Sequence, residues 1–144
     1  MKKIFLMATS ALLLSACVGK PSLNPALTNC EPQPKWFCWS SAANRTVNIN
    51  TQRKKLKASP YCIKAKKGTQ IVFTLTPPGN AALGTVELIP KDTDPSHSWL
   101  AASNSTDQDF IYVDVPPVLD ETEKYLYGIK FGNKCTDPRV DVKN

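Results

Sequence analysis

Short stretches in which every second residue is hydrophobic dominate the chain from residue 46 onward. Turn-forming residues such as Pro77-Pro78-Gly79 and Gly132-Asn133 stand between them. No stretch of eleven or more residues keeps the 3.6-residue period of an amphipathic helix. Alternation with a period of two is typical of strands that bury one face. The pattern therefore predicts an all-β domain with little helix.

About seven short strands are expected from these stripes. Their apolar positions are Val47/Ile49, Ile63/Ala65, Ile71/Phe73/Leu75, Val86/Leu88, Ile111/Val113/Val115, Tyr125/Tyr127/Ile129/Phe131 and Val140/Val142. Strands of this number and length suit a disulfide-stabilised antiparallel β-sandwich. Hydrophobic residues at 42% with 21% charged residues exclude wholesale disorder and a polytopic membrane protein.

Two segments resemble strands of known sandwich families. Residues 63–73 (IKAKKGTQIVF) resemble the early strand pair of cupredoxin-like and related immunoglobulin-like domains, and residues 137–142 (DPRVDV) resemble a closing strand. The resemblance implies an immunoglobulin-like sandwich, with cupredoxin-like topology as a variant. A blue-copper centre needs two histidines and a cysteine. Because His97 is the one histidine of the chain, we expect no copper chemistry and no other metal or cofactor.

The amino-terminal residues have the character of an export signal. Lys2 and Lys3 precede an apolar stretch over residues 4–14, which is too short to span a membrane as a stable helix. Leu14-Ser15-Ala16-Cys17 then resembles the lipobox of bacterial lipoproteins. This resemblance implies that residues 1–16 are a signal peptide and that Cys17 becomes the first mature residue, carrying covalent lipid. An ordinary cleavable signal, in which Cys17 plays no part, is the alternative.

A lipid at Cys17 would hold the mature protein on a membrane surface, because two or more acyl chains anchor a protein stably. Val18 stands where an aspartate would resemble an inner-membrane retention signal, so we expect the periplasmic face of the outer membrane. Residues 17–29 contain prolines and few large apolar side chains, and we expect them to form a flexible tether. The sandwich domain is then predicted over residues 30–144.

Four further cysteines are candidates for two disulfides: Cys30, Cys38, Cys62 and Cys135. An even number of cysteines in an exported bacterial chain is typical of disulfides, because the periplasm is oxidising. Three pairings are open. One of them closes a local loop between Cys30 and Cys38 and joins Cys62 to Cys135. A zinc site is disfavoured, because no pair has the C-x2-C spacing.

The strongest charge asymmetry is a run of seven basic residues within fifteen positions. It comprises Arg53, Lys54, Lys55, Lys57, Lys64, Lys66 and Lys67. In a hairpin-like arrangement several of these cations would project from one face and attract an anionic envelope component. Lysines on edge strands also discourage aggregation, which is the alternative role. The net charge of 18 − 12 = +6 falls to +4 when Lys2 and Lys3 leave with the signal, so we expect no nucleic-acid partner.

Trp36, Phe37 and Trp39 surround Cys38 and form a second candidate binding surface. Exposed aromatic residues of this kind anchor protein partners or lie at membrane interfaces. Packing of the same rings over one end of the sandwich is the alternative.

No constellation predicts catalysis. His97 lies near serines and acids, but no G-x-S-x-G elbow accompanies it, and we expect a loop histidine. The acidic groups Asp107/Asp109 and Asp120/Glu121/Glu123 flank predicted strands and are expected to be solvated turns rather than a carboxylate pair acting on a glycan.

Taken as a whole, the sequence favours a lipid-anchored, non-catalytic binding or structural component of a cell-envelope assembly, for example a secretion-system accessory subunit. The expected partners are the membrane, an envelope protein complex and an anionic envelope polymer. An inhibitor of a lysozyme-like hydrolase is the alternative, although its target would be basic and this domain is also positive. A peptidoglycan-active enzyme is the third candidate.

Overall fold

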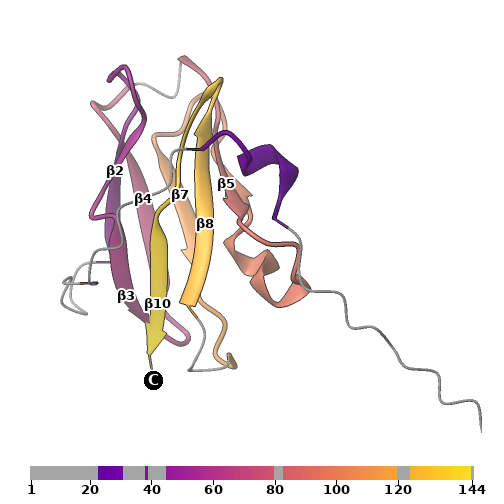
Figure 1. The fold of residues 1–144 in the computed structure, drawn as a ribbon. Coiled ribbons are helices and arrows are strands. Elements are labelled where there is room, and N and C mark those ends of the chain that lie inside the picture. Colours follow the sequence, from indigo (N-terminus) through magenta and orange to yellow (C-terminus); the bar gives the residue numbers. More distant parts are fainter. Residues whose placement is uncertain (1–22, 31–37, 39–44, 80–82, 120–123, 144) are drawn as a thin grey trace, which may run out of the picture.

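The computed structural model describes residues 23–30, 38, 45–79, 83–119 and 124–143 and shows two β-sheets packed face to face (Figure 1). The strands are β1 (Thr46–Asn50), β2 (Lys57–Ser59), β3 (Cys62–Lys66), β4 (Gln70–Thr76), β5 (Val86–Pro90), β6 (Ala102–Ser103), β7 (Phe110–Asp114), β8 (Lys124–Phe131), β9 (Lys134–Thr136) and β10 (Arg139–Lys143). The first sheet has the order β2-β1-β4-β7, and the second has the order β3-β10-β8-β5-β6 with β9 also paired to β8. Two short 3₁₀ helices, η1 (Pro25–Leu27) and η3 (Pro95–Leu100), complete the described elements.

The predicted all-β sandwich is confirmed, and each of the seven predicted stripes lies on a strand except for Val115, which directly follows β7. Both sheets are mixed rather than purely antiparallel, because β1 runs parallel to β4 and β3 runs parallel to β10. The strands β2, β6 and β9 were not predicted. Each has only two or three residues, too few to show an alternating pattern.

The apolar stripes of both sheets meet in one core. Its members are Val47, Ile49, Leu56, Ala58, Ile63, Ala65, Ile71, Phe73, Leu75, Val86, Leu88, Leu100, Ile111, Val113, Val115, Tyr125, Tyr127, Ile129, Val140 and Val142. The rings of Phe73 on β4 and Tyr127 on β8 join the two sheets edge to face, with centroids 5.7 Å apart. Burial of one face of each strand is the physical reason that the period-two pattern predicted this architecture.

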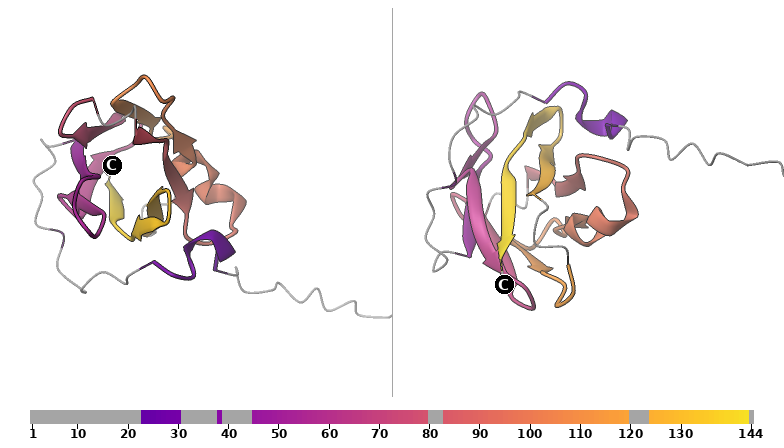
Figure 2. Two further views of the ribbon diagram at one scale, coloured as in Figure 1. Left: turned by 90° about the horizontal axis from the view of Figure 1, so that it is seen from above. Right: turned by 60° about the horizontal axis from the view of Figure 1, so that its bottom comes forward.

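Strands β2 and β3 follow each other in the chain but belong to different sheets. The chain leaves the edge of the first sheet at Ser59 and enters the edge of the second at Cys62. Both strands therefore lie along one side of the sandwich, whereas β5 and η1 lie along the other side (Figures 1 and 2). The passage of the chain from β2 to β3 therefore places residues that are close in sequence in different sheets.

Strands β8, β9 and β10 form one long antiparallel hairpin. Gly132 and Asn133 make its two-residue loop between the paired Phe131 and Lys134, and Gly132 takes a left-handed φ of 58°. Glycine is favoured at this position of a tight hairpin turn, because other L-residues are strained at positive φ. Beyond the loop, β9 and then β10 pair with β8 in the same register.

The segment Leu23–Cys30 lies on the outer face of the second sheet. Leu23 bridges to Asp92, and the Asn24 amide donates to the Lys91 carbonyl at 2.8 Å. Leu27 is 5% exposed and packs on Gly128 of β8, where a Cβ atom would come within 2.1 Å of Leu27 Cδ2. The folded body therefore includes Leu23–Cys30, a segment that overlaps the predicted tether of residues 17–29.

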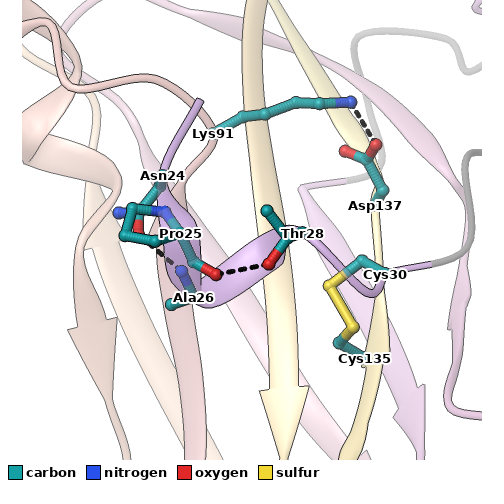
Figure 3. The surroundings of a disulfide bond; sticks show 8 residues. All are labelled: Asn24, Pro25, Ala26, Thr28, Cys30, Lys91, Cys135 and Asp137. Carbon is teal, nitrogen blue, oxygen red and sulfur yellow. Dashed lines mark hydrogen bonds and ion pairs between the residues drawn. A yellow bond between two sulfur atoms is a disulfide. The ribbon is translucent and has the colours of Figure 1, made fainter. Parts of the chain in front are cut away.

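Two disulfides join Cys30 to Cys135 and Cys38 to Cys62. The prediction that these four cysteines form two disulfides is confirmed. The pairing with a local Cys30–Cys38 loop is wrong. The physical reason is the docked segment Leu23–Cys30, which brings Cys30 against β9 (Figure 3).

Candidate functional site

Several predicted site residues lie outside the described residues. These are the lipidation candidate Cys17 and the aromatic residues Trp36, Phe37 and Trp39. For them the sequence-based predictions stand unchanged. The basic residues, by contrast, are all placed by the structure.

The structure divides the seven basic residues between the two sheets. Arg53, Lys54 and Lys55 occupy the loop of the β1–β2 hairpin, and Lys57 begins β2 in the first sheet. The other three belong to the second sheet or to the turn after it: Lys64, Lys66 and Lys67. The crossing between β2 and β3 divides the run, because the outward faces of the two sheets point in opposite directions.

Side-chain hydrogen bonds hold the backbone of the β1–β2 loop, residues 51–56. Asn50 Oδ1 accepts hydrogen bonds from the amides of Gln52 at 3.2 Å and Arg53 at 3.3 Å. The ammonium group of Lys134, at the start of β9, donates to the Thr51 and Arg53 carbonyls, each at 3.0 Å. A cation from the opposite sheet thus fixes the loop that carries three further cations.

Lys134 is a residue that the sequence did not reveal. It follows the Gly132-Asn133 turn and has no local pattern that distinguishes it from any other surface lysine. Only the packing of the two sheets brings the Lys134 ammonium group into contact with the β1–β2 loop. Lys143 was missed for the same reason, since it adjoins Lys66 through the parallel β3–β10 pairing at the other end of the molecule.

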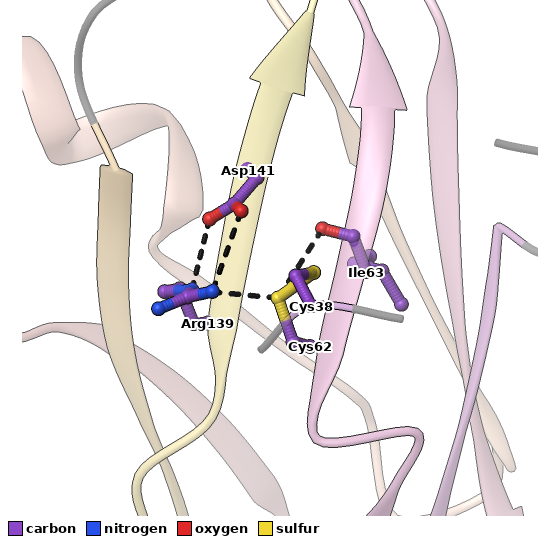
Figure 4. A network of polar contacts seen from close by, with 5 residues as sticks. All are labelled: Cys38, Cys62, Ile63, Arg139 and Asp141. Carbon is purple, nitrogen blue, oxygen red and sulfur yellow. Dashed lines mark hydrogen bonds and ion pairs between the residues drawn. A yellow bond between two sulfur atoms is a disulfide. The ribbon is translucent and has the colours of Figure 1, made fainter. Parts of the chain in front are cut away.

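A polar network surrounds the Cys38–Cys62 disulfide (Figure 4). Arg139 Nε lies 2.9 Å from Asp141 Oδ1 and 3.4 Å from Cys62 Sγ. Potential ligand atoms of Cys38, Cys62 and Asp141 lie within 4.8 Å of one another. The two sulfurs are bonded to each other, however, and a disulfide offers no thiolate to a metal. The adjacent guanidinium would also repel a cation, so the arrangement suits a structural role.

A second ion pair holds the region beneath the docked amino-terminal segment. Lys91 Nζ pairs with Asp137 Oδ2, between the end of β5 and the link from β9 to β10 (Figure 3). Thr28 Oγ1 donates to the Pro25 carbonyl at 2.7 Å and closes the turn after η1. The ion pair thus orders the body next to the segment, and the Thr28 hydrogen bond orders the segment itself.

His97 lies in η3 and is 7% exposed. Its Nδ1 atom is 2.8 Å from Asp92 Oδ1, and its ring meets Tyr125 edge to face at 4.9 Å. Asp94 caps η3 by accepting from the Ser96 amide at 2.9 Å, and this hydrogen bond lowers the pKa of the Asp94 carboxyl. His97 is thus placed as a buried residue of η3, between β5 and β6, that packs on Tyr125.

Two of the acidic residues singled out in the sequence, Asp107 and Asp109, hold loops. Asp107 accepts from Ser105 Oγ, and that hydrogen bond lowers the pKa of Asp107. Asp109 Oδ2 accepts from the Gly79 amide, so it holds the loop after β4. Residues Asp120, Glu121 and Glu123 lie outside the described residues.

Asn104 begins a sequon in the sequence but is only 4% exposed. Its Oδ1 accepts from the Val86 amide, and its Nδ2 donates to the carbonyls of Ser105 at 3.0 Å and Gln108 at 2.7 Å. The side chain fixes the loop between β6 and β7. A role as an acceptor of glycan is incompatible with this burial.

Comparison with protein-family models, curated proteins and solved structures finds no significant match for this chain. Across residues 23–30, 38, 45–79, 83–119 and 124–143, no helix is both long enough and apolar enough to cross a bilayer.

Proposed function

We propose that the protein is an outer-membrane lipoprotein, exposed to the periplasm, that acts as a non-catalytic binding or structural component of an envelope assembly. An accessory subunit of a secretion system is one such component. The observation that carries this proposal is Cys17, which directly follows a basic and apolar leader in the lipobox-like sequence Leu14-Ser15-Ala16-Cys17.

The two disulfides support export. All four cysteines after Cys17 are within two disulfides, and such bonds persist in oxidising compartments such as the periplasm. A cytosolic protein of this size would be kept reduced. The disulfides therefore agree with the compartment that the leader indicates.

The surroundings of His97 and the carboxylates support a binding role over catalysis. His97 is buried and in contact with Asp92 and Tyr125, and Asp107 and Asp109 close loops. A general base must lie within reach of a substrate proton. Groups that are used to hold the fold suit that task poorly.

The anchor is tested with Cys17→Ala, which is expected to release the protein into the soluble periplasmic fraction. Ser15→Ala keeps a small residue before the cysteine and serves as the matched control that stays with outer membranes. Mass spectrometry of the native protein should find acyl chains on residue 17. An unacylated amino terminus, or retention of the Cys17→Ala protein on membranes in high salt, would overturn the proposal.

A further inference from the structure

The basic β1–β2 loop lies at one end of the sandwich. Because β1 and β4 are parallel, both end there, at Asn50 and Thr76. The β8–β9 turn lies at the same end, since Lys134 reaches the carbonyls of Thr51 and Arg53. This end therefore combines the β1–β2 loop, the loop from β4 to β5 and the β8–β9 turn.

The base of the loop is fixed while its tip faces solvent. Thr51 is 2% exposed and Leu56 is 5% exposed, whereas residues 52–55 are exposed. Lys134 and Asn50 hold the backbone in between. The tip thus presents Arg53, Lys54 and Lys55 on a preformed loop, which lowers the entropy lost when a ligand binds.

Charge is distributed unevenly across this end of the molecule. The cations lie on the β2 side of the first sheet, whereas Asp107 and Asp109 precede β7 at its opposite edge. These two carboxylates accept hydrogen bonds from Ser105 and Gly79. The positive potential is consequently concentrated at the β1–β2 loop, where a charged surface attracts counter-charged ligands.

An exposed apolar side chain accompanies the cations. Leu83, in the loop from β4 to β5, is 68% exposed. Cations and an exposed leucine at the same end of the sandwich fit the boundary between lipid headgroups and acyl chains, where cations meet phosphate and a leucine enters the apolar layer.

We propose that the β1–β2 loop binds the phosphate groups of anionic phospholipid headgroups, with Arg53, Lys54 and Lys55 as the contacting residues and Lys134 as the positioning residue. This inference rests on the proposed lipid anchor. The six Cα–Cα steps from Cys17 to the docked Leu23 span at most about 21 Å. Acyl chains at Cys17 would keep the body close to a membrane surface, where a basic loop can meet anionic headgroups.

The test uses the mature chain with Cys17→Ser, so that no lipid contributes to binding. Vesicles of phosphatidylcholine alone and vesicles with added phosphatidylglycerol are compared by co-sedimentation at low and high salt. We expect binding to the phosphatidylglycerol vesicles at low salt and its loss at high salt, because salt screens exposed charges. Each cation near an anionic surface corresponds to about a five-fold change in partitioning.

Arg53→Glu combined with Lys54→Glu should therefore weaken vesicle binding by about 25-fold or more. The matched control combines Lys66→Glu with Lys143→Glu at the other end of the molecule, which changes the net charge equally. The control should retain most of the binding. Lys134→Met should weaken binding and Lys134→Arg should restore it, with thermal unfolding used to show that every variant folds.

Equal losses in the two reversed pairs would overturn the proposal, because net charge alone would then explain binding. Binding that ignores phosphatidylglycerol, or that appears only with an acidic protein or isolated cell wall, would also overturn it. Acylation of Cys17 in the native protein is measured separately. An acylated protein whose Cys17→Ser form ignores the vesicles would refute the loop inference while leaving the proposed function intact.

Discussion

At the scale of single residues, Tyr127 combines a large apolar contact with an unsatisfied polar atom. Its ring is completely buried against Phe73, and within the described structure its hydroxyl has no hydrogen-bond partner. A buried hydroxyl without a partner costs about 1–3 kcal/mol. Burial also raises the pKa of this phenol far above its usual range.

Tyr127→Phe is therefore expected to increase the free energy of unfolding by about 1 kcal/mol, measured by urea denaturation. Tyr112→Phe is the matched control, because Tyr112 is 59% exposed and its hydroxyl is solvated; its effect should stay within about 0.5 kcal/mol. Destabilisation of the Tyr127→Phe protein would show that the hydroxyl has a partner in the folded state.

We also expect Tyr127→Phe to change how the free energy of unfolding depends on pH in alkaline solution. The folded-state pKa of Tyr127 is raised, so the unfolded chain loses this proton first when the pH exceeds about 10. The free energy of unfolding is therefore unaffected by this proton below about pH 10 and decreases above it, because only the unfolded chain then releases the proton. The advantage of the Tyr127→Phe protein should consequently widen above about pH 10.

At the scale of elements, the docking of the amino-terminal segment depends on the absence of a side chain at Gly128. Leu27 occupies the space that a Cβ atom there would need. Gly128 does not have a positive φ, so a substitution is limited by this contact rather than by backbone strain. The segment therefore packs on β8 by placing the large side chain of Leu27 over the backbone of Gly128.

Gly128→Ala should lower the free energy of unfolding by about 1–3 kcal/mol through overpacking. It should also increase hydrogen exchange over residues 24–30. In a Leu27→Ala background the added loss should largely disappear, because the clashing atoms are gone. Equal losses in both backgrounds would mean that Leu27 does not pack on Gly128.

The alternation of hydrophobic residues is sufficient to predict the strands that bury one face in the core. Alternation predicted β1, β3, β4, β5, β7, β8 and β10, because each buries one face in the core. It missed β9, whose residues Lys134-Cys135-Thr136 carry no apolar stripe and are held by pairing with β8. The docked segment also lacked a pattern, since one leucine over one glycine supplies its apolar contact.

At the scale of the whole molecule, the disulfides close loops of very different length. Cys30–Cys135 has a sequence separation of 105 and Cys38–Cys62 one of 24. In the chain-entropy model these loops correspond to about 4.8 and 3.4 kcal/mol of stabilisation. The longer loop constrains the unfolded chain more.

Replacing both Cys30 and Cys135 by Ala should therefore lower the free energy of unfolding more than replacing both Cys38 and Cys62. A difference of about 1 kcal/mol is expected in denaturant unfolding of the two double variants. Peptide mapping of the unreduced protein should first show the two pairings directly. A peptide that links Cys30 to Cys38 would contradict the pairing described above.

The candidate site illustrates what a linear sequence conceals. The basic residues 53–67 form one run in the chain, but the passage from β2 to β3 distributes them over both sheets. Conversely, Lys134 is distant in sequence and yet contacts the loop at Arg53. The sequence shows that these basic residues are present. Which of them lie together depends on the order of the strands in the two sheets, and the alternation of hydrophobic residues does not determine that order.

The Cys30–Cys135 bond also determines how the molecule would carry a mechanical load. Tension applied at the amino-terminal side of Leu23 first reaches η1 and then passes through this covalent link into β9. The chain between residues 30 and 135 lies inside the closed loop and is bypassed. A pull from that side would thus extend the short docked segment first, while strands β1 to β8, which lie inside the closed loop, stay shielded from the force.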